Sequence, residues 1–406
     1  MKQYIDLIKD ILLNGNSRTD RTNTGTISVF GRQLRFNLEH GFPLITTKRV
    51  DLRFIIEELI WFLAGSTSNV TLENKGVTIW NEWALEEDSS SFKRGDLGPI
   101  YGKQWRDWSH EGSKAQPELS IKERLALIFT DSALRHVKSV LSDNLPESEE
   151  YVHTLLTSWG VPGGSKGKKV YDQIEALITG LKNKPYSRRH LVSSWNVPYL
   201  PDEAKTPQEN VVNGKQALPA CHTLFQFYVE DIPFDKIKNY ITNKKRLFSF
   251  KTQSDLTWAS CGSAVEYVSD MNGSCYSKYP ENYVSLMLAW CNENNVKTKR
   301  LSCQLYQRSQ DTCLGAPYNI ASYSLLLMMI AQVTNMVAGD YIHTIGDAHI
   351  YKNHIEKAKE QISREPFALP TMSLNPEVTD IFSFKLTDFI LDDYKHHPRI
   401  IYPIAI

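Results

Sequence analysis

Apolar residues recur with a helical period in two segments of the chain and with a strand-like pattern between them. In the first fifteen residues they fall on one helical face, made of Tyr4, Ile5, Ile8, Ile11 and Leu12. Residues 52–65, LRFIIEELIWFLAG, repeat the helical period. Residues 25–38, GTISVFGRQLRFNL, carry β-branched and aromatic residues that favour a strand. Helix, strand and helix in this order indicate a mixed α/β protein.

The composition and pattern of the chain change in two stretches further along. Residues from about 109 to 182 are charged and helical in pattern, and residues from about 231 to 299 are rich in Asn, Lys and Ser. We therefore expect one α/β (α+β) domain over residues 1–406, with insertions at about 109–182 and 231–299. Three separate domains are the alternative, but each block between the insertions is small for an independent core.

Composition and charge bear on location and partners. The chain has 406 residues, 41% of them hydrophobic, and a formal net charge of zero, so no overall field favours nucleic acid or an acidic membrane. Asp6, Lys9 and Asp10 interrupt any apolar run that a signal peptide would need, and the apolar stretch 324–330 is too short for a membrane span. The six cysteines form no CxxC pair, so we expect reduced thiols in the cytoplasm and no metal site.

One cysteine is placed for chemistry. Cys221 follows Pro219 and Ala220 and precedes the strand-like run 223–229, TLFQFYV. His222 is a poor general base for it, because neighbours in a strand point to opposite faces. A cation would have to stabilise the thiolate, and an arginine is the natural one. The alternative is that Cys221 is a plain core residue.

A second strand-like segment, 301–309 (LSCQLYQRS), leads into a turn and a helix. Arg308 and Ser309 end this strand with a guanidinium fork and a hydroxyl, which suit a phosphate. Asn319 follows near the helix start, where it could read a ligand or only cap the helix.

Joined together, these segments resemble the thymidylate synthase family. The resemblance covers about two-thirds of the chain, in the family's order, through segments 20–49, 57–67, 78–84, 95–108, 187–197, 218–229, 307–323, 346–354, 363–366 and 402–406. It implies a large mixed sheet flanked by helices. It also implies that dUMP is methylated to dTMP by 5,10-methylenetetrahydrofolate, through a covalent bond between Cys221 and C6 of the base.

The resemblance assigns the catalytic and dUMP-binding roles residue by residue. Cys221, Glu58, Tyr101, Arg308 and Asn319 match catalytic positions. The dUMP contacts would come from Arg21, Arg188, Arg189, Arg308, Ser309, Gln310, Asp311, Asn319, His349 and Tyr351. In the family the paired arginines 188 and 189 cross from a second subunit, which implies a homodimer, although an Arg-Arg pair alone would be a solvated surface feature.

Three of these residues can also be judged by their own chemistry. The Asn319 amide can accept from uracil N3–H and donate to O4, which favours dUMP over dCMP. Glu58 lies on an otherwise apolar helix, where burying a carboxylate is costly unless it has a purpose. Its neighbour Glu57 is expected to face solvent. Gln310 is expected to contribute through its backbone.

Folate would lie against an apolar and aromatic wall. The matching positions are Trp80, Trp83, Asp311, Leu314, Gly315, Tyr318, Ala405 and Ile406, the last two from a tail that closes over the ligand. Asp51 departs from the residues that many family members carry near the folate, which leaves its role open.

Two other functions stay open at this point. A dUMP hydroxymethylase would admit water where a synthase excludes it, and Trp80 with the apolar tail favours exclusion. An RNA-binding autoregulator is the other alternative, but the chain carries no RNA-recognition signature and its basic residues are balanced by acidic ones.

Overall fold

The computed structural model describes residues 1–19, 24–109, 171–233, 236–237, 268–269, 275–276, 291 and 296–404. The chain divides into two compact units, one of Met1–Trp105 with Gln173–Ile406 and one of Arg106–Asp172. Helix α8 (Gln173–Asn183) falls within the first expected insertion but groups with the larger unit, into which it buries Ile174, Leu177 and Leu181. Most of the second expected insertion lies outside the described residues.

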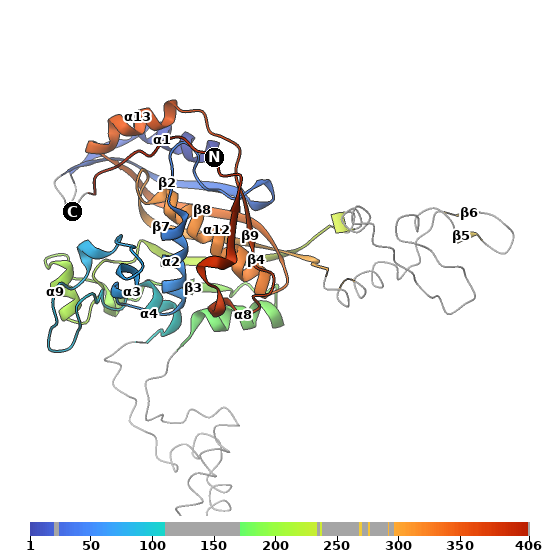
Figure 1. The fold of residues 1–406 in the computed structure, drawn as a ribbon, viewed down its shortest axis with the longest axis horizontal. Coiled ribbons are helices and arrows are strands. Elements are labelled where there is room, and N and C mark those ends of the chain that lie inside the picture. The colour runs from blue at the N-terminus through green and yellow to red at the C-terminus, as the bar shows by residue number, and fades with distance from the viewer. Residues whose placement is uncertain are drawn as a thin grey trace, which may run out of the picture. The chain divides into compact units, whose positions relative to one another are not determined.

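The larger unit is built on a six-stranded mixed sheet, as expected (Figure 1). Its strands, in spatial order, are β1 (Asn16–Arg18), β2 (Thr26–Asn37), β8 (Val337–Tyr351), β7 (Lys299–Asp311), β4 (His222–Asp231) and β3 (Leu191–Ser193). Only β7 and β8 pair in parallel, and the other neighbours are antiparallel. Asp231 pairs with Lys299, so the two ends of the chain between β4 and β7 leave the sheet side by side.

Helix α12 (Ala316–Val333) makes the crossover between the parallel strands and packs on both of them. The helix carries apolar residues of its own on every side, which is typical of a helix buried in a core. Helix α2 (Leu52–Leu63) packs on α12, and α1 (Lys2–Asn14) packs on β2 and on α13 (Ile355–Ser363). The side chain of Asp51, whose role the sequence left open, accepts a hydrogen bond from Arg53 N at 3.1 Å and caps α2.

The remaining described elements are short. The helices are α3 (Val70–Glu73), α4 (Tyr101–Arg106) and α9 (Pro207–Val212). The 3₁₀ turns are η1 (Leu38–His40), η2 (Asn81–Trp83), η3 (Val197–Tyr199), η4 (Lys352–His354), η5 (Ile381–Ser383) and η6 (Leu386–Asp388). Two small hairpins pair β9 (Thr371–Leu374) with β10 (Phe389–Asp392), and β5 (Val268–Ser269) with β6 (Cys275–Tyr276). No described helix is both long and apolar enough to cross a membrane.

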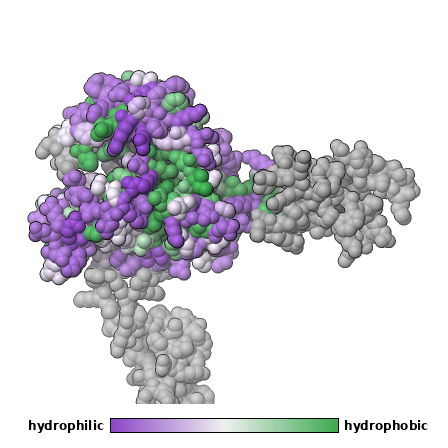
Figure 2. Space-filling model, in the orientation of Figure 1, coloured by the Kyte–Doolittle hydropathy of each residue, from purple (hydrophilic) through white to green (hydrophobic). Residues whose placement is uncertain are grey.

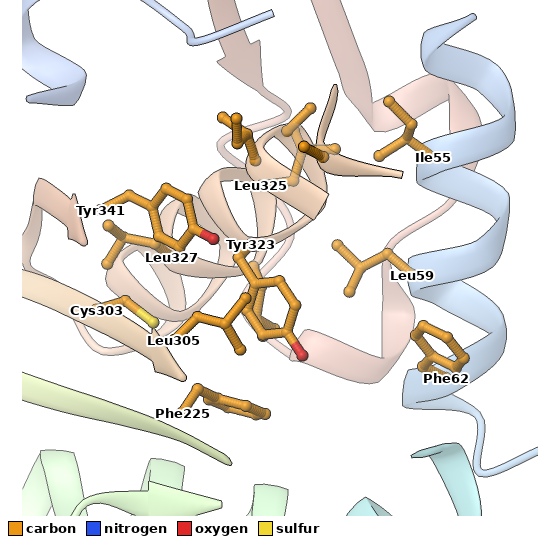
Figure 3. Close-up of a cluster of buried hydrophobic side chains, with 14 of the residues drawn as sticks. Ile55, Leu59, Phe62, Phe225, Cys303, Leu305, Tyr323, Leu325, Leu327 and Tyr341 are labelled. Carbon is orange, nitrogen blue, oxygen red and sulfur yellow. The ribbon is translucent and has the colours of Figure 1, made fainter. Parts of the chain in front are cut away.

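The core lies between one face of the sheet and helices α2 and α12. Figure 3 shows side chains from all three layers pointing toward one another: Ile55, Leu59, Phe62, Phe225, Cys303, Leu305, Tyr323, Leu325, Leu327 and Tyr341. In the space-filling view, hydrophobic residues gather in the middle of the face while hydrophilic residues dominate the rim (Figure 2). Burial of the core side chains between the sheet and the two helices is the main stabilising contribution to the unit.

The other face of the sheet carries exposed or half-exposed side chains on its central strands. The register places these on one side: Leu191, Gln226, Tyr228, Gln304, Tyr306, Ile342 and Thr344. Gln304 Nε2 and Gln33 Nε2 both donate to Thr344 Oγ1, at 2.9 and 3.0 Å. This face is therefore a broad surface of mixed polarity on the described chain.

The expectation that Glu57 faces solvent was wrong. Its side chain is buried, with 6% of the residue exposed, and its Oε2 lies 2.5 Å from Lys75 Nζ. Lys75 follows the short helix α3 and reaches back to α2, so an ion pair compensates the buried charge. A helical period alone could not show this partner, because it lies 18 residues away.

Two leucines give a matched test of the core. Leu305 is fully buried under α12, whereas Leu13 at the end of α1 is 83% exposed. Leu305→Ala should lower the free energy of unfolding by about 3–5 kcal/mol through lost contacts and a cavity. Leu13→Ala should change it by less than about 0.5 kcal/mol. Chemical denaturation of both variants measures this, and equal effects would contradict the described packing.

Candidate active site

The carboxyl ends of β7 and β8 and the beginning of β4 meet at one edge of the sheet. In the parallel pair, Ser309 lies opposite Asp347 and Asp311 opposite His349. On the other side of β7, His222 pairs with Gln307 next to an irregularity in the register. Arg308 N donates to Cys221 O at 2.9 Å. Residues from distant segments of the chain are thus brought to a single edge.

Cys221 and Arg308 are in direct contact. Arg308 Nη2 lies 3.7 Å from Cys221 Sγ and donates to Pro219 O at 3.0 Å, while Nε donates to Ala220 O at 3.1 Å. The aromatic face of Trp195 lies 5.5 Å from the same guanidinium. Backbone carbonyls and an aromatic ring therefore fix the cation beside the sulfur, which stabilises a thiolate there. Cys221 itself is only partly buried.

Tyr101 contacts the backbone of Cys221. Its hydroxyl oxygen accepts a hydrogen bond from Cys221 N at 2.8 Å. Its ring packs against Phe62 and His222, with ring centroids 5.1 and 5.2 Å away. Burial raises the pKa of the phenol, so Tyr101 stays a neutral hydroxyl. It is therefore placed both to hold the backbone of Cys221 and to pass on a hydrogen bond.

Glu58 is a carboxylate with an unusual proton affinity. Burial raises its pKa to about 7, and the hydrogen bond that Trp80 Nε1 donates to Oε1 at 2.8 Å opposes this only in part. Trp80 in turn packs on Trp61 and Tyr101. A carboxyl group with this pKa can both give and take a proton near neutral pH.

Asn319 lies in the first turn of α12 and faces the same region. Its Oδ1 accepts a hydrogen bond from Gln307 Nε2 at 3.1 Å, and its side chain also bonds to His222. Burial lowers the pKa of His222 to about 4, so this imidazole is neutral at physiological pH. The capping role left open for Asn319 does not apply, because the N-cap of α12 is Gly315.

His349 and Tyr351 end β8 side by side. His349 Nδ1 lies 3.2 Å from Asp347 Oδ1. The rings of His349 and Tyr351 meet edge to face with centroids 5.3 Å apart. Thr312 N donates to His349 O at 2.9 Å, which joins this strand end to the turn that follows β7. The carboxylate of Asp347 therefore orients the imidazole.

The turn that follows β7 is shaped by Asp311. Its Oδ1 accepts hydrogen bonds from Cys313 N and Leu314 N, both at 2.9 Å. Gln310, next to it, is fully buried and points away from the edge, so only its backbone is available there. Ser309 stays partly exposed at the strand end.

Aromatic and apolar groups surround the approach to Glu58. Trp80 and Trp83 meet edge to face with centroids 5.9 Å apart. Trp83, Leu314 and Tyr318 are partly exposed and pack against the edge of the core, and Gly315 adds no side chain. Trp80 therefore holds an aromatic ring against Glu58. Burial raises the pKa of Tyr318, and the same carboxyl group of Glu58 lies close enough to raise that pKa further.

The other expected site residues are not gathered at this edge by the described chain. Arg188 and Arg189 lie exposed in the turn between α8 and the edge strand β3. Arg21, Ala405 and Ile406 lie outside the described residues. Among the described residues, no group of three or more His, Cys, Asp or Glu side chains is arranged to hold a metal ion.

Three residues near the site were not singled out by the sequence: Trp195, Gln307 and His343. Gln307 could have been, because strand alternation puts it on the face of Leu301, Cys303 and Leu305, where a polar side chain needs a partner. Trp195 and His343 gave no such local signal.

The raised pKa of Glu58 gives a pH test. The folded protein binds a proton on Glu58 up to about pH 7, whereas the unfolded chain releases it at about 4.5, so this group makes stability fall as pH rises between these values. Compared with Glu58→Gln, the wild-type free energy of unfolding should drop by up to roughly 3 kcal/mol over this range. Denaturant titrations at several pH values measure the difference, and a constant difference would contradict the assignment.

Comparison with known families agrees with this geometry. The family model described as thymidylate synthase matches residues 2–247 and 281–406. The gap between the two matched stretches falls inside the second expected insertion. The matched stretches include every segment that forms the sheet edge described above. The chain therefore belongs to the thymidylate synthase family.

Proposed function

We propose that this chain methylates dUMP to dTMP, using 5,10-methylenetetrahydrofolate as the donor of the one-carbon unit and the hydride. The observation that carries the proposal is the 3.7 Å contact between Arg308 Nη2 and Cys221 Sγ. It sits at a strand edge that also presents an amide, a phenol and a carboxyl group with a raised pKa. Family membership supports the same general chemistry.

Cys221 acts as the nucleophile. Its thiolate adds to C6 of the pyrimidine, and the electron pair of the C5–C6 double bond moves toward C5 and O4. C5 then forms a bond to the one-carbon unit and loses its proton while the bond from that carbon to the folate nitrogen breaks. Hydride from the folate then adds to the resulting methylene group, the C5–C6 double bond re-forms and the thiolate leaves C6. Arg308 stabilises the thiolate at the start and again at the end of this sequence.

The phosphate of dUMP lies near Arg308 and Ser309. Arg308 keeps one face for the phosphate because its Nε and Nη2 are held by Ala220 O and Pro219 O. Arg21 joins this pair, and Arg188 and Arg189 come from a second copy of the chain. Several guanidinium groups on one dianion give the strong and directional binding that a small substrate needs.

Asn319 reads the base, and His349 with Tyr351 holds the ribose hydroxyl. When dUMP binds, Asn319 Oδ1 exchanges its bond with His222 for one from uracil N3–H and keeps the bond from Gln307. Its NH₂ group then donates to O4. The Asp347 contact leaves the opposite nitrogen of His349 for the sugar.

Glu58 and Tyr101 manage the protons. With a pKa of about 7, Glu58 can protonate O4 as charge develops there and take the proton back later. Tyr101, kept neutral by burial, helps to remove the C5 proton by hydrogen-bonding an ordered water that accepts it. Glu58 thus exchanges a proton near its own pKa, whereas Tyr101 stays uncharged throughout.

The residues present fit a folate. Trp80, Trp83, Leu314 and Tyr318 would hold its ring system, Gly315 leaves room for close approach, and Asp311 accepts from the pterin. A Cβ at Gly315 would lie 3.3 Å from Asp311 O, so the turn tolerates no larger residue without shifting. Ala405 and Ile406 would close over the ligand.

We also propose a homodimer. The open face of the sheet, with Tyr228 and Tyr306 exposed among amides, suits a second copy of itself in polarity. Arg188 and Arg189 lie exposed beside the edge strand β3 and form no ion pair with a described acid. We propose the cytoplasm as the location, because the mechanism requires Cys221 to stay reduced.

Hydroxymethylation of dUMP is the second candidate, and it differs only in letting water take the place of the hydride. The hydrogen bond that holds Trp80 to Glu58 favours the synthase, since it fixes a large ring where water would enter. An RNA-binding role is the weaker alternative, because Cys221 lies in contact with Arg308 and Tyr101 at one place.

Product analysis tests the proposal directly. Purified protein with dUMP and 5,10-methylenetetrahydrofolate should yield dTMP and dihydrofolate, identified by mass spectrometry. Hydroxymethyl-dUMP with tetrahydrofolate would identify the second candidate, and no product of either kind would refute both. Cys221→Ala should reduce turnover by at least about 10⁴-fold, since the covalent adduct at C6 needs this thiolate. Cys303→Ala, at a buried thiol under α12, should leave the reaction intact and serves as the control.

A further inference from the structure

Three polar side chains lie buried behind Asn319, inside the apolar layer between the sheet and α12. Gln307 and Gln310 come from β7 and His343 from β8, and all three are at most 3% exposed. The adjacent buried positions are apolar, such as Leu305 and Ile345. Burying three polar groups at this place is costly unless they are well bonded.

Their hydrogen bonds have one consistent direction. Gln307 Nε2 donates to Asn319 Oδ1 at 3.1 Å and to Ser309 O at 3.0 Å, which makes the other end of its amide the oxygen. Gln307 Oε1 lies 2.8 Å from His343 Nε2 and 3.4 Å from Gln310 Nε2, and these two nitrogens lie 3.2 Å apart. The shortest of the three contacts makes His343 Nε2 a donor to Gln307 Oε1. Gln310 Nε2 then donates to Gln307 Oε1 and only touches the His343 ring.

This direction fixes the tautomer of His343. Nε2 must carry the hydrogen, because its closest partner is an acceptor. Burial lowers the pKa of His343 to about 3, so the ring is neutral and cannot switch the chain by titration near pH 7. Among the described residues, His343 Nδ1 and Gln310 Oε1 have no hydrogen-bond partner.

Stability alone does not account for this arrangement. Each buried polar atom without a partner lowers stability, and an apolar side chain of similar size would avoid that cost. A role that depends on the direction of the hydrogen bonds would account for it.

We infer that His343 and Gln310 are positioning residues that select uracil over cytosine by holding the Gln307 amide, and through it the Asn319 amide, in one orientation. The inference rests on the proposed function. With Oδ1 facing Gln307 Nε2, Asn319 offers a lone pair to N3–H and its NH₂ group to O4. Rotating the Asn319 amide by 180° would match cytosine instead, but it would set NH₂ against NH₂.

The cost of that rotation sets the expected effect. Losing one buried hydrogen bond and opposing two donors corresponds to about a tenfold change in an equilibrium constant. If His343 and Gln310 are removed, only the bond to Ser309 O still opposes rotation of the Gln307 amide, and the Asn319 amide is held less firmly. Discrimination between dUMP and dCMP should then fall by about this factor.

The test compares dissociation constants for dUMP and dCMP, measured by calorimetry, in full-length variants. His343→Leu should lower the ratio of the two constants about tenfold, and His343→Gln, which keeps a donor, should restore most of it. Gln310→Met, which removes the longer contact, should lower the ratio about threefold. Tyr341→Phe is the control, because it loses a buried hydroxyl two residues away with no hydrogen-bond partner in the described chain.

The outcomes separate this inference from the proposed function. Wild-type protein that binds neither nucleotide would refute the proposed function itself. Wild-type protein that prefers dUMP, with folded His343→Leu and Gln310→Met variants that keep the same ratio, would overturn only the inference. If His343→Leu does not fold, Gln310→Met and His343→Gln decide. A lower ratio in Tyr341→Phe as well would show a general packing effect and would also overturn it.

Discussion

The contact between the Arg308 guanidinium and the Cys221 sulfur is the interaction on which the rest of the site depends. A thiol is a weak nucleophile unless a nearby cation stabilises its thiolate, and here the cation is held by two backbone carbonyls and the face of Trp195. In the proposed function the same guanidinium also binds the substrate phosphate. One arginine then links the binding of the nucleotide to the reactivity of the nucleophile.

The sheet topology makes this contact possible. Arg308 lies near the carboxyl end of β7, and the irregular pairing at the beginning of β4 brings Cys221 beside it. The parallel pairing of β7 with β8 adds His349 on the other side, and the crossover helix α12 begins at the same edge with Asn319 in its first turn. The proposed nucleophile, phosphate site and base-reading amide therefore share one rigid frame.

Much of this could be predicted from the sequence, because it depends on local patterns. The helical period before residue 65, the strand after Cys221 and the turn after Arg308 are short-range features, and the mixed sheet flanked by helices was confirmed. The family was also predicted correctly from its segments.

What the sequence could not give depends on partners far along the chain. Glu57 was expected to face solvent because its ion pair with Lys75 forms only after α3 turns back. The bond between Gln307 and His343 joins residues 36 positions apart, and it exists only because α12 carries the chain back to a parallel strand. Trp195 reaches Arg308 in the same way, through the fold rather than through spacing.

The most direct measurement is the rate at which Cys221 is alkylated by iodoacetamide, followed by peptide mass spectrometry at neutral pH. Cys221 should react much faster than the buried Cys303 and Cys313, dUMP should protect it, and Arg308→Leu should slow it at least tenfold. A Cys221 rate that neither dUMP nor the loss of Arg308 changes would contradict the central claim.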